Sequence, residues 1–99
     1  MNKIKLYEIK LNDAKELGID TWNRWQCEES SFDWEYPEEE TAYVYEGEVI
    51  VTTTDERVHI KENMLVTFPR GLKCHWEVKK RIDKVYTFNF DEVILNNIK

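Results

Sequence analysis

The segment LVTFPRGLKCHWEV, residues 65–78, decides the fold class of this 99-residue chain. It begins with apolar and β-branched residues, breaks at Pro69-Arg70-Gly71, and continues as an alternation of apolar and polar residues. Pro and Gly are typical of turns, and a period of two is typical of a β-strand with one buried face. The segment therefore predicts two strands joined by a turn.

Strand-like segments of the same kind fill most of the remaining chain. Residues 42–54 are rich in Tyr, Val, Ile and Thr, residues 58–60 alternate, and residues 82–90 place Ile82, Lys84, Tyr86, Phe88 and Phe90 on one face. The polar turns predicted between the strands are 54–57, 61–63 and 79–81. Many short strands with turns roughly every ten residues predict an all-β sandwich or barrel, and closure would remove exposed edges.

The first 21 residues predict a short extension before the barrel. Residues 3–11 alternate as a strand, with a phase slip near Tyr7-Glu8 that predicts a bulge or a bend. Residues 12–18 carry a helical pattern of one or two turns that ends at Gly18. We expect residues 1–21 to form this strand and helical turn, packed on a barrel made by residues 22–99. A strand-rich extension can also pair with a second copy, so a homodimer is expected.

Composition excludes several classes of function. The 14 basic and 20 acidic residues give a net charge of −6, which repels a phosphate backbone and disfavours nucleic-acid binding. No apolar run is long enough to span a membrane, and the N-terminus carries no apolar stretch typical of a secretory signal. Two cysteines, Cys27 and Cys74, are too few for a secreted disulfide scaffold, so we expect reduced thiols in a cytoplasmic protein.

Several segments together resemble a known family, the small one-domain cupins. Residues 22–27, 31–36 and 40–49 resemble the first half of such a domain, and residues 65–76 resemble the second half. The chain is similar, over about residues 22–90, to the cupin domains of ureidoglycine aminohydrolase and of the ethanolamine-utilisation cupin proteins. The resemblance implies a cupin-type jelly-roll β-barrel with a pocket inside.

The chain keeps the scaffold part of the cupin motifs and lacks most of the metal-binding part. The matching scaffold residues are Glu40, Gly47, Pro69 and Gly71, and Asn63 replaces a glycine at a position where Asn tolerates a left-handed turn. The three usual histidine places hold Trp34, Tyr36 and Cys74. A catalytic metal needs about three converging ligands. We therefore expect no essential metal; if Mn, Fe or Zn is bound, Glu40 and Cys74 are the candidate ligands.

Two charged residues are candidates for the pocket. Glu40 shares a strand face with Ala42 and Val44, which predicts a pocket carboxylate; the alternative is a solvated acidic run with its neighbours. Lys84 lies on an otherwise apolar face. It is either a pocket cation, paired with Glu40 or with a ligand carboxylate, or a side chain that reaches water at the strand end.

The remaining candidates are a thiol and a set of aromatic rings. Cys74 is a nucleophile, a redox partner of Cys27, or a small buried side chain, and we favour the last interpretation. Trp22 and Trp25 are expected to pack over one end of the barrel or at a subunit contact. His59 and His75 are expected to be exposed, because strand neighbours alternate. The predicted ligand-binding residues are Trp34, Tyr36, Glu40, Cys74, Trp76, Lys84, Tyr86 and Phe88.

Three functions agree with these residues. The first is a module that binds a small molecule in the barrel pocket without an essential metal. The second, implied by the resemblance to ureidoglycine aminohydrolase, is a metal-assisted enzyme acting on a small nitrogenous or carbonyl metabolite. The third is a stability or assembly role with a filled interior and no ligand.

Overall fold

The computed structural model describes residues 3–91 of the chain. Its elements, in chain order, are β1 (Lys5–Glu8), α1 (Leu11–Lys15), the 3-10 helix η1 (Ile19–Thr21), β2 (Asn23–Cys27), β3 (Ser30–Glu35), β4 (Glu40–Thr52), β5 (Arg57–Lys61), β6 (Met64–Phe68) and β7 (Lys73–Phe88). Strands dominate, so the prediction of an all-β fold is confirmed. Residues 1–2 and 92–99, at the outer ends of the predicted extension and barrel, lie outside the described residues. Neither helix in the described range is long and apolar enough to cross a membrane.

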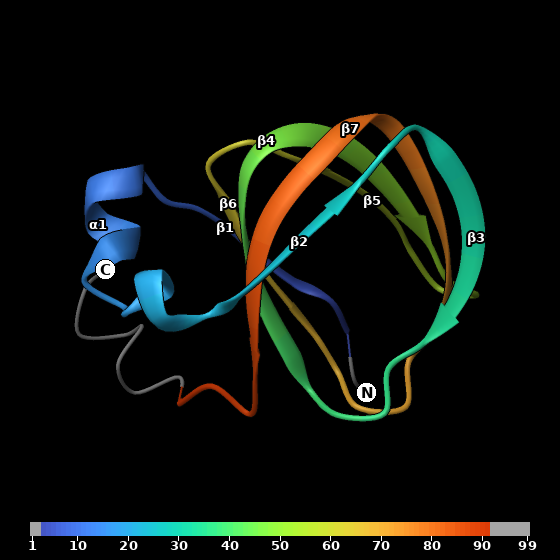
Figure 1. The fold of residues 1–99 in the computed structure, drawn as a ribbon. Helices are drawn as coiled ribbons and strands as arrows, with labels where there is room; N and C mark the ends of the chain where they lie inside the picture. The colour runs from blue at the N-terminus through green and yellow to red at the C-terminus, as the bar shows by residue number, and fades with distance from the viewer. Residues whose placement is uncertain (1–2, 92–99) are drawn as a thin grey trace.

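The strands form one antiparallel sheet with the hydrogen-bonded order β1-β6-β4-β7-β2; β3 also pairs with β7, and β5 with β4. Figure 1 shows β4 and β7 arching across the molecule, so that the sheet is strongly curved and α1 lies outside the curve. Within residues 3–91 no strand pairing joins β1 to β2. The hydrogen bonds of the described sheet therefore do not close it into a barrel.

The turn predicted at residues 79–81 is wrong, because β7 continues through this segment as one strand. Its partner β4 changes register three times between Val44 and Val49. Gly47 makes the close crossing possible: its φ is +108°, and a Cβ at this position would lie 2.4 Å from the carbonyl oxygen of Arg81. Bulges bend a strand without ending its pairing. The basic residues 79–81 are exposed at this irregular segment, which explains why they look like a turn.

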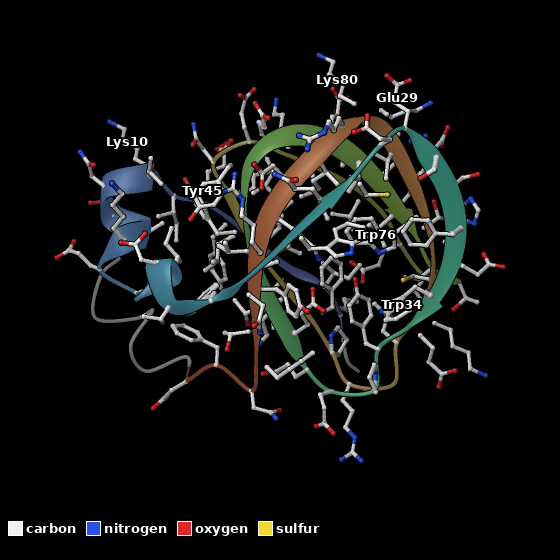
Figure 2. All side chains as sticks on the ribbon, in the orientation of Figure 1. Lys10, Glu29, Trp34, Tyr45, Trp76 and Lys80 are labelled. Carbon is white, nitrogen blue, oxygen red and sulfur yellow. The ribbon has the colours of Figure 1, made fainter. Side chains whose placement is uncertain are left out.

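The two faces of the sheet carry different cores. The concave face carries the larger one, which includes Ile4, Ala42, Val44, Val66, Phe68, Trp76 and Ile82. The convex face carries a smaller one, formed with α1 and η1 by Ile9, Ala14, Leu17, Ile19, Tyr43, Leu65 and Val85. Figure 2 shows Trp76 inside the curve of the sheet, while Lys10, Glu29 and Lys80 point outward. Residues that alternate along β4, β6 and β7 thus fill two separate cores.

The N-terminal segment contributes to both cores without the predicted bulge. Its pairing with β6 is regular from Lys5 to Glu8. Ile4 packs in the concave core and Ile9 in the convex core, as the odd spacing between them requires in an extended chain. The phase slip in the sequence therefore reflects two residues that flank β1 and pack in different cores, and the prediction of a bulge is wrong. The helix predicted over residues 12–18 is shorter than expected, because α1 ends at Lys15.

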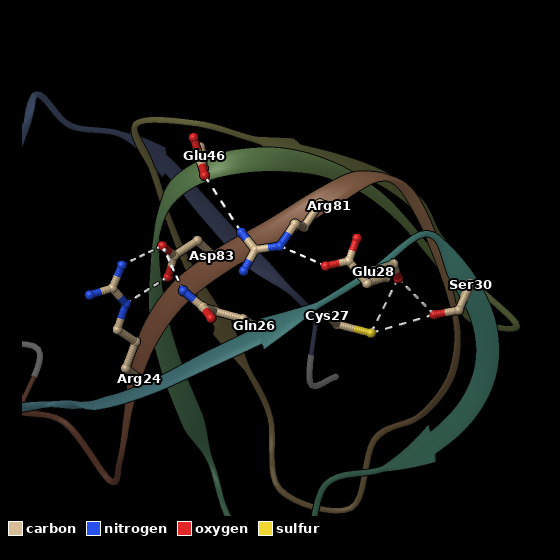
Figure 3. Close-up of polar contacts among 8 residues, drawn as sticks. All are labelled: Arg24, Gln26, Cys27, Glu28, Ser30, Glu46, Arg81 and Asp83. Carbon is tan, nitrogen blue, oxygen red and sulfur yellow. Dashed lines mark hydrogen bonds and ion pairs between the residues drawn. The ribbon is translucent and has the colours of Figure 1, made fainter.

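Ion pairs cover the convex face of β2 and β7 (Figure 3). Nε of Arg24 donates to Oδ1 of Asp83 at 2.9 Å, and the amide of Gln26 donates to Oδ2 of Asp83 at 3.2 Å. The hydrogen bond from Arg24 lowers the pKa of Asp83, although burial of the carboxylate opposes this effect. The Arg24 side chain remains 62% exposed. This cluster is therefore a partly solvated surface feature.

Candidate functional site

A cavity of about 300 Å³ opens on the concave face between β2, β3, β4 and β7. Its lining consists of aromatic rings, one proline and one pair of opposite charges, namely Trp25, Phe32, Trp34, Tyr36, Pro37, Glu40, Trp76, Lys84, Tyr86 and Phe88. The structure thus brings together every predicted ligand-binding residue except Cys74. A concave, mostly apolar site with a few polar groups is the usual form of a small-molecule site, and this volume is at the small end of the range.

Glu40 and Lys84 form a buried ion pair in the cavity wall. The Nζ of Lys84 donates to Oε2 of Glu40 at 2.8 Å, and the two side chains are only 7% and 9% exposed. The residues lie on adjacent strands, where Glu40 begins β4 and Lys84 lies in β7. Of the alternatives left open for each residue, the solvated acidic run and the side chain that reaches water are wrong. The predicted pairing of Lys84 with Glu40 is confirmed.

Three aromatic rings surround the charged end of Lys84. Its Nζ lies 4.9 Å from the ring centroid of Trp76, 5.1 Å from that of Trp25 and 5.5 Å from that of Tyr86. These distances fit cation–π attraction. Burial nevertheless lowers the pKa of Lys84, because water no longer solvates the ammonium, while Glu40 opposes this effect. The lysine is thus held in place and is easier to deprotonate than an exposed lysine.

Stacked rings form the floor of the site. The ring of Tyr36 stacks on Phe68 with centroids 4.6 Å apart, and Nε1 of Trp76 donates to the Tyr36 hydroxyl at 3.1 Å. Trp76 also stacks on Phe32 at 5.9 Å. Burial raises the pKa of Tyr36 far above its usual value. The phenol therefore stays protonated at neutral pH and is fixed as a hydrogen-bonding group.

Two aromatic side chains of the lining are open to solvent. Trp34 is 49% exposed and Phe88 is 45% exposed, which is unusual for large apolar side chains. Phe88 packs edge-to-face on Tyr86, with ring centroids 5.6 Å apart. Because both exposed rings line the cavity, they mark its opening to solvent.

Cys74 lies outside the lining. Its side chain is buried in the concave core, and Sγ donates to the backbone oxygen of Trp34 at 3.6 Å. Burial raises the pKa of the Cys74 thiol to about 11, so little thiolate forms at neutral pH. Both Cys27 and Cys74 are free thiols. The interpretation of Cys74 as a small buried side chain is confirmed, and the geometry gives it no contact with the cavity.

Three lining residues were missed from the sequence: Trp25, Phe32 and Pro37. Trp25 was expected over one end of the barrel or at a subunit contact; the structure instead places it in the cavity lining, on β2 directly opposite Lys84. Its signal is present in the sequence, where exposed Arg24 and Gln26 alternate with Trp25. Phe32 likewise belongs to the alternating series that continues through Trp34 to Tyr36. Reading these short segments as strands would have placed both rings on the concave face.

The side chains at the cupin metal positions do not fit a metal ion. Glu40 is already bonded to Lys84, whose positive charge would repel a cation. Tyr36 and Cys74, which would have to ionise to act as anionic ligands, both have raised pKa values. His59 and His75 are about half exposed, as predicted, and bond to Glu48 and Asp33 instead. Within residues 3–91, no three His, Cys, Asp or Glu side chains are grouped to hold a metal.

Comparison with solved structures agrees with this fold. A DUF861 family protein from Thermotoga maritima is 40% identical, with a TM-score of 0.82 over 87% of this chain and 99% of its own. The Clostridium difficile EutQ protein is 25% identical, with a TM-score of 0.61 over 69% of this chain and 55% of its own. A putative ethanolamine utilization protein Q from Salmonella typhimurium, 17% identical with a TM-score of 0.59 over 89% of this chain and 71% of its own, shares the fold.

A search of curated proteins gave no match. The family comparison is decisive, because the model described as the EutQ-like cupin domain matches residues 14–86. This range contains all of β4, all of β7 except its last two residues, and every residue that lines the cavity except Phe88. The local geometry agrees with that match: Glu40 is the first residue of β4, and Asn63, with a φ of 62°, takes the left-handed conformation expected for the glycine that it replaces. The chain belongs to the EutQ-like cupin domain family.

Proposed function

We propose that this cupin is a jelly-roll barrel that binds a small molecule in the aromatic cavity without an essential metal. The observation that carries the proposal is the Glu40–Lys84 pair in the wall of an apolar cavity. A buried ion pair is commonly no more stabilising than apolar residues of the same size, because both charges lose water. A buried ion pair in this wall is therefore better explained by a role in binding a ligand than by a contribution to the stability of the fold.

The pair also restricts the chemistry of the ligand. The ammonium of Lys84 supplies a hydrogen-bond donor beside an acceptor, the carboxylate of Glu40, and the two charges cancel. An anionic or cationic ligand would add an uncompensated charge in a site poor in water. A neutral, flat molecule with a carbonyl oxygen beside an N–H or O–H group matches both the pair and the surrounding rings.

A thermal-shift comparison tests the proposal. We expect neutral benzamide to raise the Tm more than benzoate or benzylamine, which carry one charge each. At about five times the Kd, binding would add about 1 kcal/mol and raise the Tm by about 4–8 °C. Glu40→Gln should abolish the benzamide shift, whereas Glu38→Gln, at an exposed position two residues earlier, should retain it.

Three results would contradict the proposal. An unchanged benzamide shift in Glu40→Gln would place the ligand outside this cavity, and no shift with any neutral probe would favour a filled, ligand-free interior. Metal analysis of untagged protein should find well under one equivalent of Mn, Fe or Zn per chain. One tightly held equivalent would instead favour the metal-assisted enzyme, although the side chains at the cupin metal positions do not fit a metal ion.

A further inference from the structure

We propose that Lys84 forms an imine with small neutral aldehydes or ketones that enter the cavity. The inference rests on the proposed function, because the carbonyl compound must first bind between the aromatic rings. Lys84 carries the only amine among the residues described as lining the cavity. A lysine enclosed in an apolar pocket is the usual setting for a nucleophilic amine.

The position of the amine meets the geometric needs of this chemistry. Three rings hold Nζ at 4.9–5.5 Å from their centroids, which fixes its place in the wall. The carboxylate of Glu40, 2.8 Å away, can accept and return a proton. The apolar lining limits access of water, which protects an imine from hydrolysis. Burial of the ammonium also increases the fraction of neutral amine.

The reaction balances with the groups present. Lys84 first gives one proton to Glu40, and the freed lone pair on Nζ attacks the carbonyl carbon, so that a C–N bond forms and the π electrons move to oxygen. Transfer of a proton from nitrogen to that oxygen, relayed by Glu40, gives a neutral carbinolamine. Glu40 then protonates the hydroxyl, which leaves as water while the nitrogen lone pair forms C=N. The products are a protonated imine on Lys84, one water, and the original Glu40 carboxylate.

Reductive trapping with benzaldehyde and sodium cyanoborohydride at neutral pH tests this inference. Peptide mapping should find a benzyl group on Lys84, added at least about tenfold faster than on Lys80, because the cavity holds the aldehyde beside Nζ of Lys84. Lys80 is a suitable internal control, because its side chain is 75% exposed. Because both lysines are compared within the wild-type protein, this measurement does not depend on the folding of a variant. Lys84→Arg should lose the fast label, and Lys80→Arg should keep it.

Competition separates this inference from the proposed function. Saturating benzamide should slow labelling of Lys84 at least about tenfold, as its occupancy of the cavity requires, and leave Lys80 unaffected. Benzamide binding without preferential labelling of Lys84 would overturn the imine but keep the binding function. Absence of both would overturn the two together. Labelling spread evenly over exposed lysines would also overturn the imine.

Discussion

Two neighbouring residues of β7, Asp83 and Lys84, point to opposite faces of the sheet and meet very different surroundings. On the convex face, the buried carboxylate of Asp83 is bonded by Arg24, whose side chain is 62% exposed. On the concave face, Lys84 is bonded to Glu40, and neither side chain is more than 9% exposed. The Arg24–Asp83 pair is therefore partly in contact with solvent, whereas both side chains of the Glu40–Lys84 pair are buried.

The difference concerns how each face closes its core. The convex core is closed by apolar packing, and its buried Tyr43 hydroxyl donates to the backbone oxygen of Ile9 at 2.8 Å. The concave core leaves a cavity and places two charges in its wall. Desolvating two charges opposes folding unless their attraction compensates. We therefore expect substitutions to separate the two faces by their effects on stability and on binding.

The largest effect should follow from breaking the concave pair. Lys84→Met leaves Glu40 buried without its counter-charge, which should lower the free energy of unfolding by about 3–5 kcal/mol. The double variant Glu40→Leu with Lys84→Met removes both charges and should be about as stable as the wild type, or more stable, while benzamide binding is lost. Urea unfolding of the three proteins measures these differences.

Lys79→Met supplies the control for an exposed pair. Its ion pair with Glu77 joins side chains that are 46% and 44% exposed, so its loss should change stability little. If the double variant Glu40→Leu with Lys84→Met were as unstable as Lys84→Met alone, the Glu40–Lys84 pair itself would stabilise the fold. The proposed contrast between the two faces would then be wrong.

An intermediate effect is expected in the convex core. Tyr43→Phe removes the donor to the Ile9 carbonyl oxygen, which is then left buried with one partner fewer. A lost hydrogen bond of this kind should lower the free energy of unfolding by about 1–2 kcal/mol. The benzamide Kd should not change, because Tyr43 belongs to the other face. A weakened Kd, measured by fluorescence titration, would instead show that the faces are coupled.

Much of the fold could be predicted, because period-two patterns report which side of a strand is buried. The prediction failed at β1, whose own residues are mostly exposed while the residues that flank it are buried. Ile4 and Ile9 looked like a slip in phase, although they lie at the two ends of a regularly paired strand and pack in different cores. It failed again at residues 79–81, where a basic run suggested a turn but Gly47 on the neighbouring strand lets β7 pass. The contact between Gly47 and β7 joins segments that are distant in the chain, so the sequence near residues 79–81 does not indicate it.

Those residues of the site that belong to the family motif or to an alternating strand pattern could be predicted from the sequence. Glu40 and Lys84 share faces with apolar neighbours, and this local evidence led to their pairing. Cys74 was placed in the site by its motif position, but burial turned it toward the Trp34 backbone. Trp25 was missed because its segment was not read as a strand. Its alternation with Arg24 and Gln26 indicates the concave face, but only the pairing of β2 with β7 sets it opposite Lys84.

The smallest effect should be the acid sensitivity of the convex pair. The lowered pKa of Asp83 means that the folded state favours its carboxylate, so its contribution is full above the unfolded value near 3.8 and is lost as pH falls through the folded pKa. The stability difference between wild type and Asp83→Asn should therefore be constant above about pH 5 and shrink below it. Because Arg24 is largely solvated, this difference should be smaller than that for Tyr43→Phe. Urea midpoints from pH 3 to 7 measure it, with Glu28→Gln as the exposed control; a difference that grows toward acid would reverse the assigned sign.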